Sequence, residues 1–394
     1  MPHGSGTTVR SLAGVRSFTG ANGATETFLC LQAAPVGGFH DQLRDLIARY
    51  AAIQDEHGLD PSGAVFRRVF VSDALNQADT VAESALARDP AGAPVAVSIV
   101  QQAPLSVPGT KLGLLAYHVD GAAPEARRQL SPHHILIERN GLGHLWSTRL
   151  CAHADGGTVS AAAQTEQVFA DLLDALEGQG GRLDAQCVRT WLYMKDVDVF
   201  YADMVTRRSE IFARHGMTAD THYIASTGIE GACAHRCDVV AMDAYSVLGL
   251  RSEQVRYLND FDRLCPTKTY NVTFERATRV GFADRAHLFI SGTASIDRFG
   301  QVVHKGDVLR QLDRALENVG ALLADGGGRL QDMMHLLVYL RDPADAAAIE
   351  GRLATVLPGV PRLLVQGAVC RPEWLVEVEG IAAVPQHAPA LPSF

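Results

Sequence analysis

The sequence predicts an α+β protein of three tandem units, each a β-sheet with two helices, packed as an intramolecular pseudo-trimer. The same order of strand and helix patterns recurs three times along the 394 residues. Two copies also share letters: Gly-Arg-Leu at 181–183 precedes a strand ending in Tyr-Met-Lys-Asp at 193–196, and Gly-Arg-Leu at 328–330 precedes one ending in Tyr-Leu-Arg-Asp at 339–342. One third of the chain is about 130 residues, an ordinary domain size, and closed packing of three units would cover their exposed sheet edges.

The first unit is expected at residues 26–130. Residues 1–25 are rich in Gly, Ser and Thr, and we expect either a mobile arm or an added edge strand there. Apolar residues at helical spacing predict an amphipathic helix from Phe39 to Gly58. The later patterns of this unit predict a strand, a second helix and two further strands, at 65–71, 76–88, 94–99 and 112–119.

The second unit is expected at 131–250, followed by a linker at 251–268, a third unit at 269–386 and a tail at 387–394. The second unit's hairpin, helix, strand, helix and closing strand are predicted at 134–150, 161–177, 188–194, 199–215 and 239–247. The third unit's two opening strands, helix, strand and helix are predicted at 274–280, 287–291, 308–324, 334–340 and 344–357. We therefore predict three copies of one module, in which β-hairpins flank a helix, a strand and a second helix.

The segment 360–382 closes the third unit and concentrates its chemically active residues. Two apolar runs flank a turn at Arg371-Pro372-Glu373, and this pattern predicts a β-hairpin. Strict alternation near the end of the segment puts Glu377 and Glu379 on one face of their strand. If the opposite, apolar face packs on helices, both carboxylates point away from them. Arg362 opens the first strand of this predicted hairpin and Cys370 ends it.

The third unit resembles the RidA/YjgF family. The resemblance rests on 288–295 (LFISGTAS), 304–307 (HKGD), 316–318 (LEN), 338–342 (VYLRD) and the segment 362–379. Members of that family are trimers of short chains with active sites in the clefts between subunits, and they hydrolyse reactive enamine or imine intermediates to keto acids and ammonia. The resemblance therefore implies three RidA-like, chorismate-mutase-like units fused into one chain.

Three stretches of the third unit also resemble the chorismatases, RidA-like enzymes that release pyruvate from chorismate: 289–296 (FISGTASI), 306–319 (GDVLRQLDRALENV) and 368–380 (AVCRPEWLVEVEG). The central unit departs from that family, because WLYMKD at 191–196 stands where chorismatases have a Trp-Asn-Tyr stretch, and the linker lacks their Tyr-Pro…Tyr-Gly-Pro run. We therefore expect imine or enamine hydrolysis first, with chorismatase-like cleavage or a non-catalytic metabolite-binding protein as alternatives.

The resemblance implies three catalytic candidates. Arg362 matches the family's carboxylate-binding arginine, although an ion pair with Glu377 or Asp307 would also explain it. Glu379 matches the family's acid, which orients water or transfers a proton, and burial in an apolar cleft would raise the pKa of such a carboxyl group. Cys370 offers a backbone N–H or a thiol for the substrate, and plain packing is the alternative.

Seven further residues are expected to bind the substrate. One group lies in the third unit, where a glycine at a strand end allows a ligand to approach the backbone and an arginine either binds the substrate or pairs with Glu379. The other group belongs to a hydroxyl-rich segment of the second unit, 221–231, which we expect to form a second wall of the cleft; a glycine-terminated strand whose side chains bond within the protein is the alternative. The seven residues are Arg371, Ser291, Gly292, Thr293, His222, Tyr223 and Glu230.

The closing strands of the three units differ in their polar residues. Glu379 aligns with Asp243 in the second unit and Leu115 in the first, so only the later units keep a carboxylate there. Arg362 has no cationic counterpart at 94–99 in the first unit. The first unit is therefore expected to be a scaffold, and we expect one principal site lined by the third unit and a neighbour.

Composition excludes several classes of function. A net charge of −9 and a pI near 5.9 count against nucleic-acid binding or RNA cleavage. No apolar run approaches the length of a membrane span, and the first residues lack the apolar core of a signal peptide. We expect a cytoplasmic protein, monomeric as a pseudo-trimer or a low-order homo-oligomer, whose partner is a small carboxylate-bearing molecule.

The cysteines predict neither disulfides nor a metal site. Their number, seven, is odd, and their scattered positions fit a reducing compartment. The run Cys233-Ala234-His235-Arg236-Cys237 offers three soft ligands, but structural zinc needs four ligands with wider spacing between the pairs. No glycine-rich phosphate loop of the Walker or dinucleotide kind is present. The sequence therefore predicts no metal and no cofactor.

Overall fold

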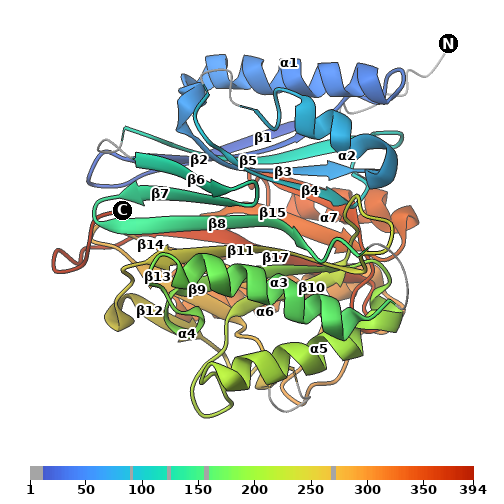
Figure 1. Ribbon diagram of the computed structural model, residues 1–394. Coiled ribbons are helices and arrows are strands. Elements are labelled where there is room, and N and C mark those ends of the chain that lie inside the picture. The colour runs from blue at the N-terminus through green and yellow to red at the C-terminus, as the bar shows by residue number, and fades with distance from the viewer. Residues whose placement is uncertain (1–11, 89–91, 122–125, 155–158, 268–271) are drawn as a thin grey trace.

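The computed structural model describes residues 12–88, 92–121, 126–154, 159–267 and 272–394 (Figure 1). The first unit is a five-stranded sheet in the order β1-β2-β5-β3-β4. Apolar residues of the longer helix, among them Leu43, Leu46 and Tyr50, are buried against one face of this sheet. The elements are β1 (Ala13–Thr19), β2 (Thr25–Gln32), α1 (Phe39–His57), β3 (Ala64–Val71), α2 (Ala74–Glu83), β4 (Ala96–Gln101) and β5 (Leu112–Asp120).

The second unit is a six-stranded sheet in the order β10-β9-β11-β8-β7-β6. Strand β9, between β10 and β11, is buried on both faces: Leu192 and Met194 pack with the helices, whereas Trp191 and Tyr193 pack in the core between the units. The elements are β6 (Ala126–Ser131), β7 (His134–Arg139), β8 (Leu142–Cys151), α3 (Ala161–Glu177), α4 (Leu183–Gln186), β9 (Cys187–Met194), α5 (Val197–Arg214), β10 (Ala225–Glu230) and β11 (Val240–Leu248).

The third unit is a six-stranded sheet in the order β12-β13-β14-β17-β15-β16. Its helix α6 has the strongly amphipathic pattern of a helix that packs on a sheet and buries Leu312, Leu316 and Leu323. The elements are β12 (Val255–Leu258), β13 (Ala277–Gly281), β14 (Arg285–Ala294), α6 (Val308–Asp325), β15 (Met333–Leu340), α7 (Ala346–Val356), β16 (Arg362–Gln366) and β17 (Val376–Pro385).

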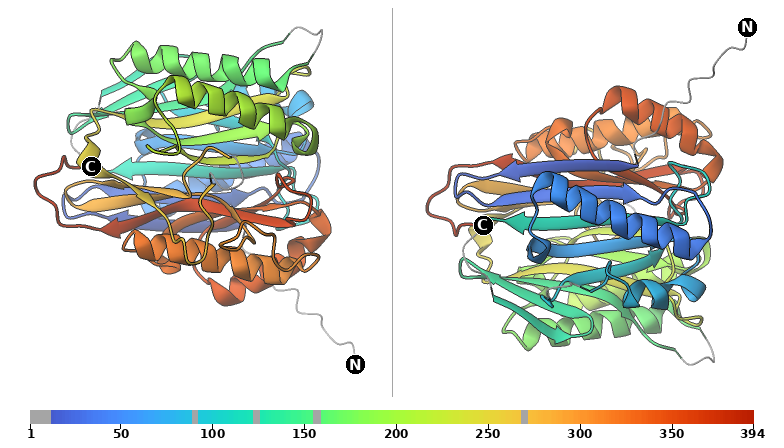
Figure 2. Two further views of the ribbon diagram at one scale, coloured as in Figure 1. Left: turned by 90° about the horizontal axis from the view of Figure 1, so that it is seen from below. Right: turned by 90° about the horizontal axis from the view of Figure 1, so that it is seen from above.

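The three units close into a ring. Strand β4 of the first unit contacts β8 of the second, β10 of the second contacts β14 of the third, and β16 of the third contacts β2 of the first. Figure 2 shows the three sheets facing one another, with the helices on the outside. The α+β pseudo-trimer predicted by the sequence is therefore confirmed.

The predicted closing hairpins are wrong. Strands β16 and β17 do not pair with each other, because β15 lies between them, parallel to β16 and antiparallel to β17. The units β15-α7-β16 and β9-α5-β10 are crossovers that return the chain to the sheet as a parallel neighbour, and the next strand then pairs on the other side. The same arrangement separates β4 from β5 in the first unit. A turn with proline between two apolar runs occurs both in a hairpin and between strands that do not pair, so the sequence pattern does not distinguish the two.

Each sheet extends beyond the bounds expected for its unit. Strand β1, within 1–25, pairs with β2 as an edge strand, which was one of the two expected forms of that segment. Strand β6 pairs with β7 and begins five residues before the expected start of the second unit. Strand β12 lies within the expected linker and pairs with β13. Among the described residues, no helix is both long enough and apolar enough to cross a membrane.

The tail packs at one end of the ring, where all three units meet. The backbone oxygen of Phe394 accepts hydrogen bonds from Asn22 of the first unit and Asn140 of the second, at 2.8 and 2.7 Å. Its ring is 2% exposed and packs against Phe282 and His287 of the third unit, with ring centroids 5.1 and 4.9 Å away. Phe394 therefore contacts all three units, the first and second through its backbone oxygen and the third through its ring.

We expect Phe394→Ala to lower the free energy of unfolding by about 3–5 kcal/mol, the usual loss when a buried phenylalanine is truncated. Urea unfolding followed by tryptophan fluorescence measures this loss. Phe299→Ala is the matched control, because the Phe299 side chain is exposed. Equal stability of the two variants would show that the Phe394 ring does not stabilise the packing of the tail.

Candidate active site

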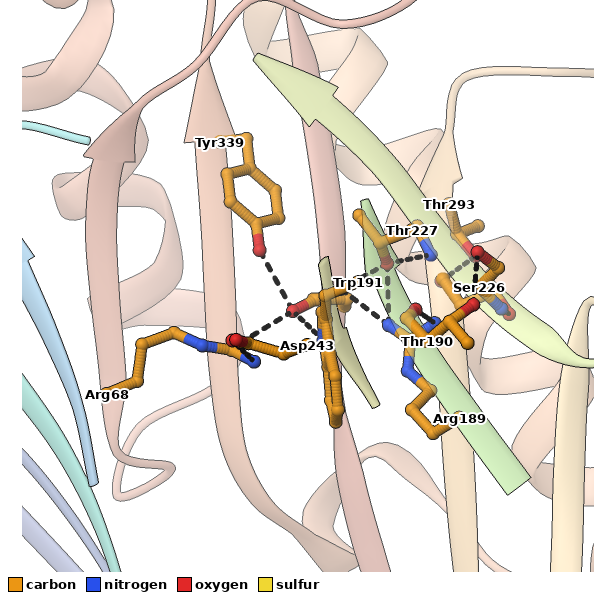
Figure 3. A network of polar contacts seen from close by, with 12 residues as sticks. Arg68, Arg189, Thr190, Trp191, Ser226, Thr227, Asp243, Thr293 and Tyr339 are labelled. Atoms are coloured by element: carbon orange, nitrogen blue, oxygen red, sulfur yellow. Dashed lines mark hydrogen bonds and ion pairs between the residues drawn. The ribbon is translucent and has the colours of Figure 1, made fainter. Parts of the chain in front are cut away.

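A fully buried ionic network joins the three units at the centre of the ring (Figure 3). Glu379 on β17 accepts hydrogen bonds from Arg189 Nη2 at 2.6 Å, Trp191 Nε1 at 2.9 Å and the Tyr339 hydroxyl at 2.9 Å. The hydroxyl of Thr227 on β10 also donates to Glu379. Both carboxylate oxygens of Glu379 are therefore engaged by protein groups.

The first unit contributes a cation to the same network. Arg68 on β3 donates to Asp243 on β11 at 3.0 Å, and its guanidinium lies 3.9 Å from Glu379. The two arginines Arg68 and Arg189 thus balance the two carboxylates. Glu379 is 1% exposed and does not line the cavity described below. We expected Glu379 to handle water, but the structure gives it four protein partners in the core.

The cavity of interest lies between the second and third units. Its walls come from α5 and β10 of the second unit, and from β14, β17 and the segments before β13 and β17 of the third. It offers about 30 Å³ of free space, room for one or two water molecules, so a metabolite requires movement of the lining side chains. It is lined by Tyr201, Arg208, Ser226, Thr227, Gly228, Phe274, Arg276, Gly292, Ala294, Ile296, Cys370, Trp374 and Glu377.

Glu377 is the acid of this cavity. The residue is 5% exposed, and burial, followed by the charge of nearby Glu379, raises the pKa of its carboxyl group to about 8. Among the described residues, nothing donates a hydrogen bond to Glu377 Oε1. A buried polar atom without a partner is uncommon and indicates a place for a ligand or water. At neutral pH this carboxyl group is protonated and can donate a proton.

Gly292 leaves the space that this carboxyl group occupies. A Cβ atom at position 292 would overlap Glu377 Oε1, closer than any real contact allows. The Gly292 backbone N–H donates to the Thr227 hydroxyl at 2.9 Å, which ties β14 to β10 across the cleft. The lack of a side chain at position 292 therefore leaves the space in which the Glu377 carboxyl group lies.

Two buried arginines complete the cavity. Arg208 on α5 is 2% exposed and donates from Nε to the Thr273 hydroxyl at 3.3 Å. Arg276, just before β13, is 3% exposed and donates to the Cys265 backbone oxygen at 3.1 Å. Guanidinium groups suit planar carboxylates, which they bind with paired hydrogen bonds. One cavity thus combines a protonated acid with two cations.

The other catalytic candidates lie in different surroundings. Arg362 pairs with Glu350, with Nε 3.0 Å from Oε1, in a separate cleft between the third and first units. This partner is neither Glu377 nor Asp307. Cys370 lines the cavity, but burial, followed by the charge of Glu377, raises the pKa of its thiol to about 12. The thiol is therefore protonated at neutral pH and is no nucleophile.

Among the expected binding residues of the third unit, Gly292 alone lines the cavity. Ser291 is buried behind it, where its hydroxyl donates to the Glu275 backbone oxygen at 2.6 Å and accepts from the Ser226 N–H at 2.9 Å. Thr293 donates to the Ser291 backbone oxygen at 2.8 Å. Arg371 stacks on Trp374, with its guanidinium carbon 4.6 Å from the ring centroid, and does not line the cavity.

The hydroxyl-rich segment of the second unit does form a wall, but through other residues than expected. Ser226, Thr227 and Gly228 line the cavity. His222 instead contacts the Asp184 backbone oxygen at 2.8 Å, and Tyr223 packs beside Phe212. The carboxylate of Glu230 accepts from the Ala368 N–H at 2.9 Å. These three side chains hold the wall in place and do not face the cavity.

Sequence reasoning missed Glu377, Arg208, Arg276 and Tyr201 as cavity residues. A signal existed for Arg208, because it lies within the buried stripe of α5 beside Met204, Val205 and Phe212. An arginine inside an apolar stripe is rarely buried without a partner or a function. Glu377 shares a face with Glu379, and only the packing of the neighbouring unit decides which of the two meets the cleft.

Strand register allows the three clefts to be compared position by position. Glu377 pairs with Tyr339, and the equivalent pairs are Ala241 with Tyr193 and Gly113 with Phe70. The clefts between the first and second units and between the third and first units therefore lack the acid. The same register confirms the alignment of Glu379 with Asp243 and Leu115.

Comparisons with known proteins agree with this architecture. The family model described as Endoribonuclease L-PSP matches residues 275–384. The 3-aminoacrylate deaminase RutC of Acinetobacter baylyi is 33% identical over 99 residues, which are 25% of this chain and 79% of that protein. The chain belongs to the RidA/YjgF family.

A larger share of this RidA-family chain matches chorismatases. The chorismatase of Streptomyces rapamycinicus is 28% identical over 249 residues, covering 56% of this chain and 70% of that protein. A crystal structure of a chorismatase superposes with a TM-score of 0.60 at 20% identity, covering 82% of this chain and 93% of that chain. This RidA-family protein therefore shares its fold over most of its length with a chorismatase.

Proposed function

We propose that this RidA-family protein is a chorismatase-like enzyme, which hydrolyses the enol ether of chorismate and releases pyruvate at the cavity between the second and third units. One observation carries the proposal: the protonated carboxyl group of Glu377 shares a single buried cavity with two arginines, Arg208 and Arg276. Chorismate carries two carboxylates and an acid-labile enol ether, which are the groups that such a set of residues binds and protonates. The chorismatase relative adds support.

The chemistry requires one acid and one water molecule. Glu377 donates its proton to the methylene carbon of the enolpyruvyl double bond, and the positive charge that forms on the ether carbon is shared with the ether oxygen. Water adds to that carbon and forms a hemiketal. The bond between the hemiketal carbon and the ether oxygen on the ring then breaks, and that oxygen takes up a proton. Pyruvate leaves, the ring keeps a hydroxyl group, and a proton from water restores Glu377. The arginines hold the carboxylates so that the double bond faces the acid.

Hydrolysis of an imine or enamine is the second candidate, and the likeness of the third unit to RutC favours it. The same acid would protonate the enamine carbon, water would add to the iminium carbon, and ammonia would leave. A small enamine acid has one carboxylate and needs a single guanidinium. The presence of two buried arginines in the cavity therefore favours the dicarboxylate.

Turnover assays with the purified protein test the proposal. Pyruvate release from chorismate is followed in parallel with ammonia release from freshly generated 2-aminoacrylate. We expect pyruvate from chorismate, and we expect Arg208→Met to raise KM strongly because one carboxylate loses its partner. Ammonia release faster than the uncatalysed hydrolysis, with chorismate untouched, would overturn the proposal in favour of the deaminase. Tight chorismate binding without turnover would indicate a binding protein.

We expect Gly292→Ala to lower kcat/KM about 100-fold, because the added methyl group displaces the Glu377 carboxyl group and a misplacement of about 1 Å is that costly. Steady-state kinetics on the substrate found above measures the effect. Gly351→Ala is the control, since a Cβ atom there meets nothing within 4 Å. Unchanged turnover in Gly292→Ala would contradict the role given to Glu377.

A further inference from the structure

A second cluster of reactive side chains lies at the far end of β8. Cys151 ends that strand and is buried, and Cys233 follows β10 and is half-buried. The rings of His153 and His235 are exposed and meet edge to face, with centroids 4.3 Å apart. The donor atoms of Cys151, His153 and His235 lie within 4.8 Å of one another, and so do those of Cys151, Cys233 and Asp238. Cys151 therefore belongs to both groups.

Cys151 and the two imidazoles lie near the spacing of a tetrahedral ion, whereas Cys233 groups with Cys151 and Asp238 and not with the imidazoles. With zinc–sulfur bonds of about 2.3 Å and zinc–nitrogen bonds of about 2.0 Å, a sulfur and a nitrogen ligand stand roughly 3.5 Å apart. Cys151 Sγ lies 3.7 Å from His153 Nε2 and 3.9 Å from Nδ1. Binding of one ion by all four side chains therefore requires the exposed imidazoles to rotate toward Cys233. Two thiols with two imidazoles form a ligand set that zinc commonly takes in proteins.

The backbone beneath the cluster is held in place. His153 has φ of +53°, a left-handed conformation that is costly for a residue with a side chain. The buried carboxylate of Asp238 stabilises it by accepting hydrogen bonds from the N–H groups of His153 at 3.0 Å and Ala154 at 2.9 Å. Asp238 thus positions the loop that presents the His153 ring, as residues behind metal ligands do.

The cluster occupies the place in the second unit that corresponds to the active cavity of the third. Cys151 pairs with Ala241 exactly where, in the third unit, Ala294 pairs with Glu377. Ala232, next to Cys233, forms a bridge with Gln101 at the end of β4 of the first unit. This cleft has Ala241 at the position of the acid and Cys151 opposite it.

We propose that Cys151, Cys233, His153 and His235 bind one zinc ion beside the cleft between the first and second units. The ion ties the end of β8 to the loop before β11, both of which belong to the second unit. Spacing within 233–237 gave no sign of the site, because two of the four ligands come from a segment about 80 residues earlier. Cys237, the third soft residue of that run, is outside the cluster.

Cobalt titration of the full chain tests the site, after metal has been removed with a chelator in the presence of a phosphine reductant. We expect one Co²⁺ per chain, the visible absorption of tetrahedral cobalt, and a near-ultraviolet thiolate-to-cobalt band with the intensity of two thiolates. Added Zn²⁺ should bleach both. Asp238→Asn should weaken binding about 10- to 100-fold, and loss of a ligand should weaken it at least as much.

Variants within one segment distinguish the site from adventitious binding. Cys233→Ser should halve the thiolate band and His235→Ala should weaken binding, whereas Cys237→Ser should bind as the wild type does. Exposed His235 can be replaced without disturbing the core, so misfolding does not obscure the result. Absence of bound cobalt, equal binding in Cys233→Ser, or loss of binding in Cys237→Ser would overturn the proposal.

Discussion

Glu377→Gln should slow turnover strongly while leaving the protein folded. Glutamine has nearly the same shape as a protonated glutamate but no acidic proton, so the step that protonates the substrate loses its acid. General acids contribute about 10²–10⁴-fold to rate, and we expect kcat to fall by that factor with KM little changed. Steady-state kinetics measures both. Wild-type kcat in this variant would show that Glu377 is not the acid.

The pH dependence of the wild type follows from the same group. The pKa of Glu377 is raised to about 8, so activity should be constant near neutral pH and fall about tenfold per pH unit above 8. The raised pKa also destabilises the fold as pH rises from about 4.5 to 8, because the carboxyl group ionises in the unfolded chain and stays protonated in the folded one. Glu377→Gln removes this cost and should therefore unfold at a higher temperature at pH 8 than the wild type does.

Glu379→Gln should have the opposite effect on stability. Among the described residues, the substitution leaves Arg68 and Arg189 buried with Asp243 as their one remaining ion-pair partner. Removing one partner from a buried ion pair costs about 3–5 kcal/mol. We expect the free energy of unfolding in urea to fall by that amount, a loss far larger than an exposed acid would give.

The two glutamine variants are matched controls for each other, because they stand two residues apart on β17. A second comparison isolates the ion pair: replacing both Arg189 and Glu379 with Met removes the uncompensated charge, and stability should recover relative to Glu379→Gln. Equal stability of Glu379→Gln and the wild type would contradict the role of the central network.

The sequence revealed the repeat, and with it the fold, because strand and helix periodicity and the shared letters around 193–196 and 339–342 are local features. The closing hairpins were wrong because the partner of a strand is decided by its neighbours in space: β15 lies between β16 and β17. A turn signal reports that the chain reverses, and it does not report what lies between the two strands.

The sequence correctly placed β17 at the site, but the residues that it combined lie in different clefts. Strand β16 with Arg362 faces the first unit, whereas β17 with Glu377 faces the second. In a trimer of identical chains this difference vanishes, because every cleft receives both residues. In a fused chain the residues at equivalent positions differ from cleft to cleft. The cations in the cavity with Glu377 are Arg208 and Arg276. A repeat alone does not show which unit faces which.

A crystal structure with a stable dicarboxylate analogue of chorismate tests the central claim most directly. We expect the analogue between the second and third units, with its carboxylates on Arg208 and Arg276 and its side chain against Glu377. Density for the analogue at Arg362, between the third and first units, would contradict the assignment of the active cleft to Glu377.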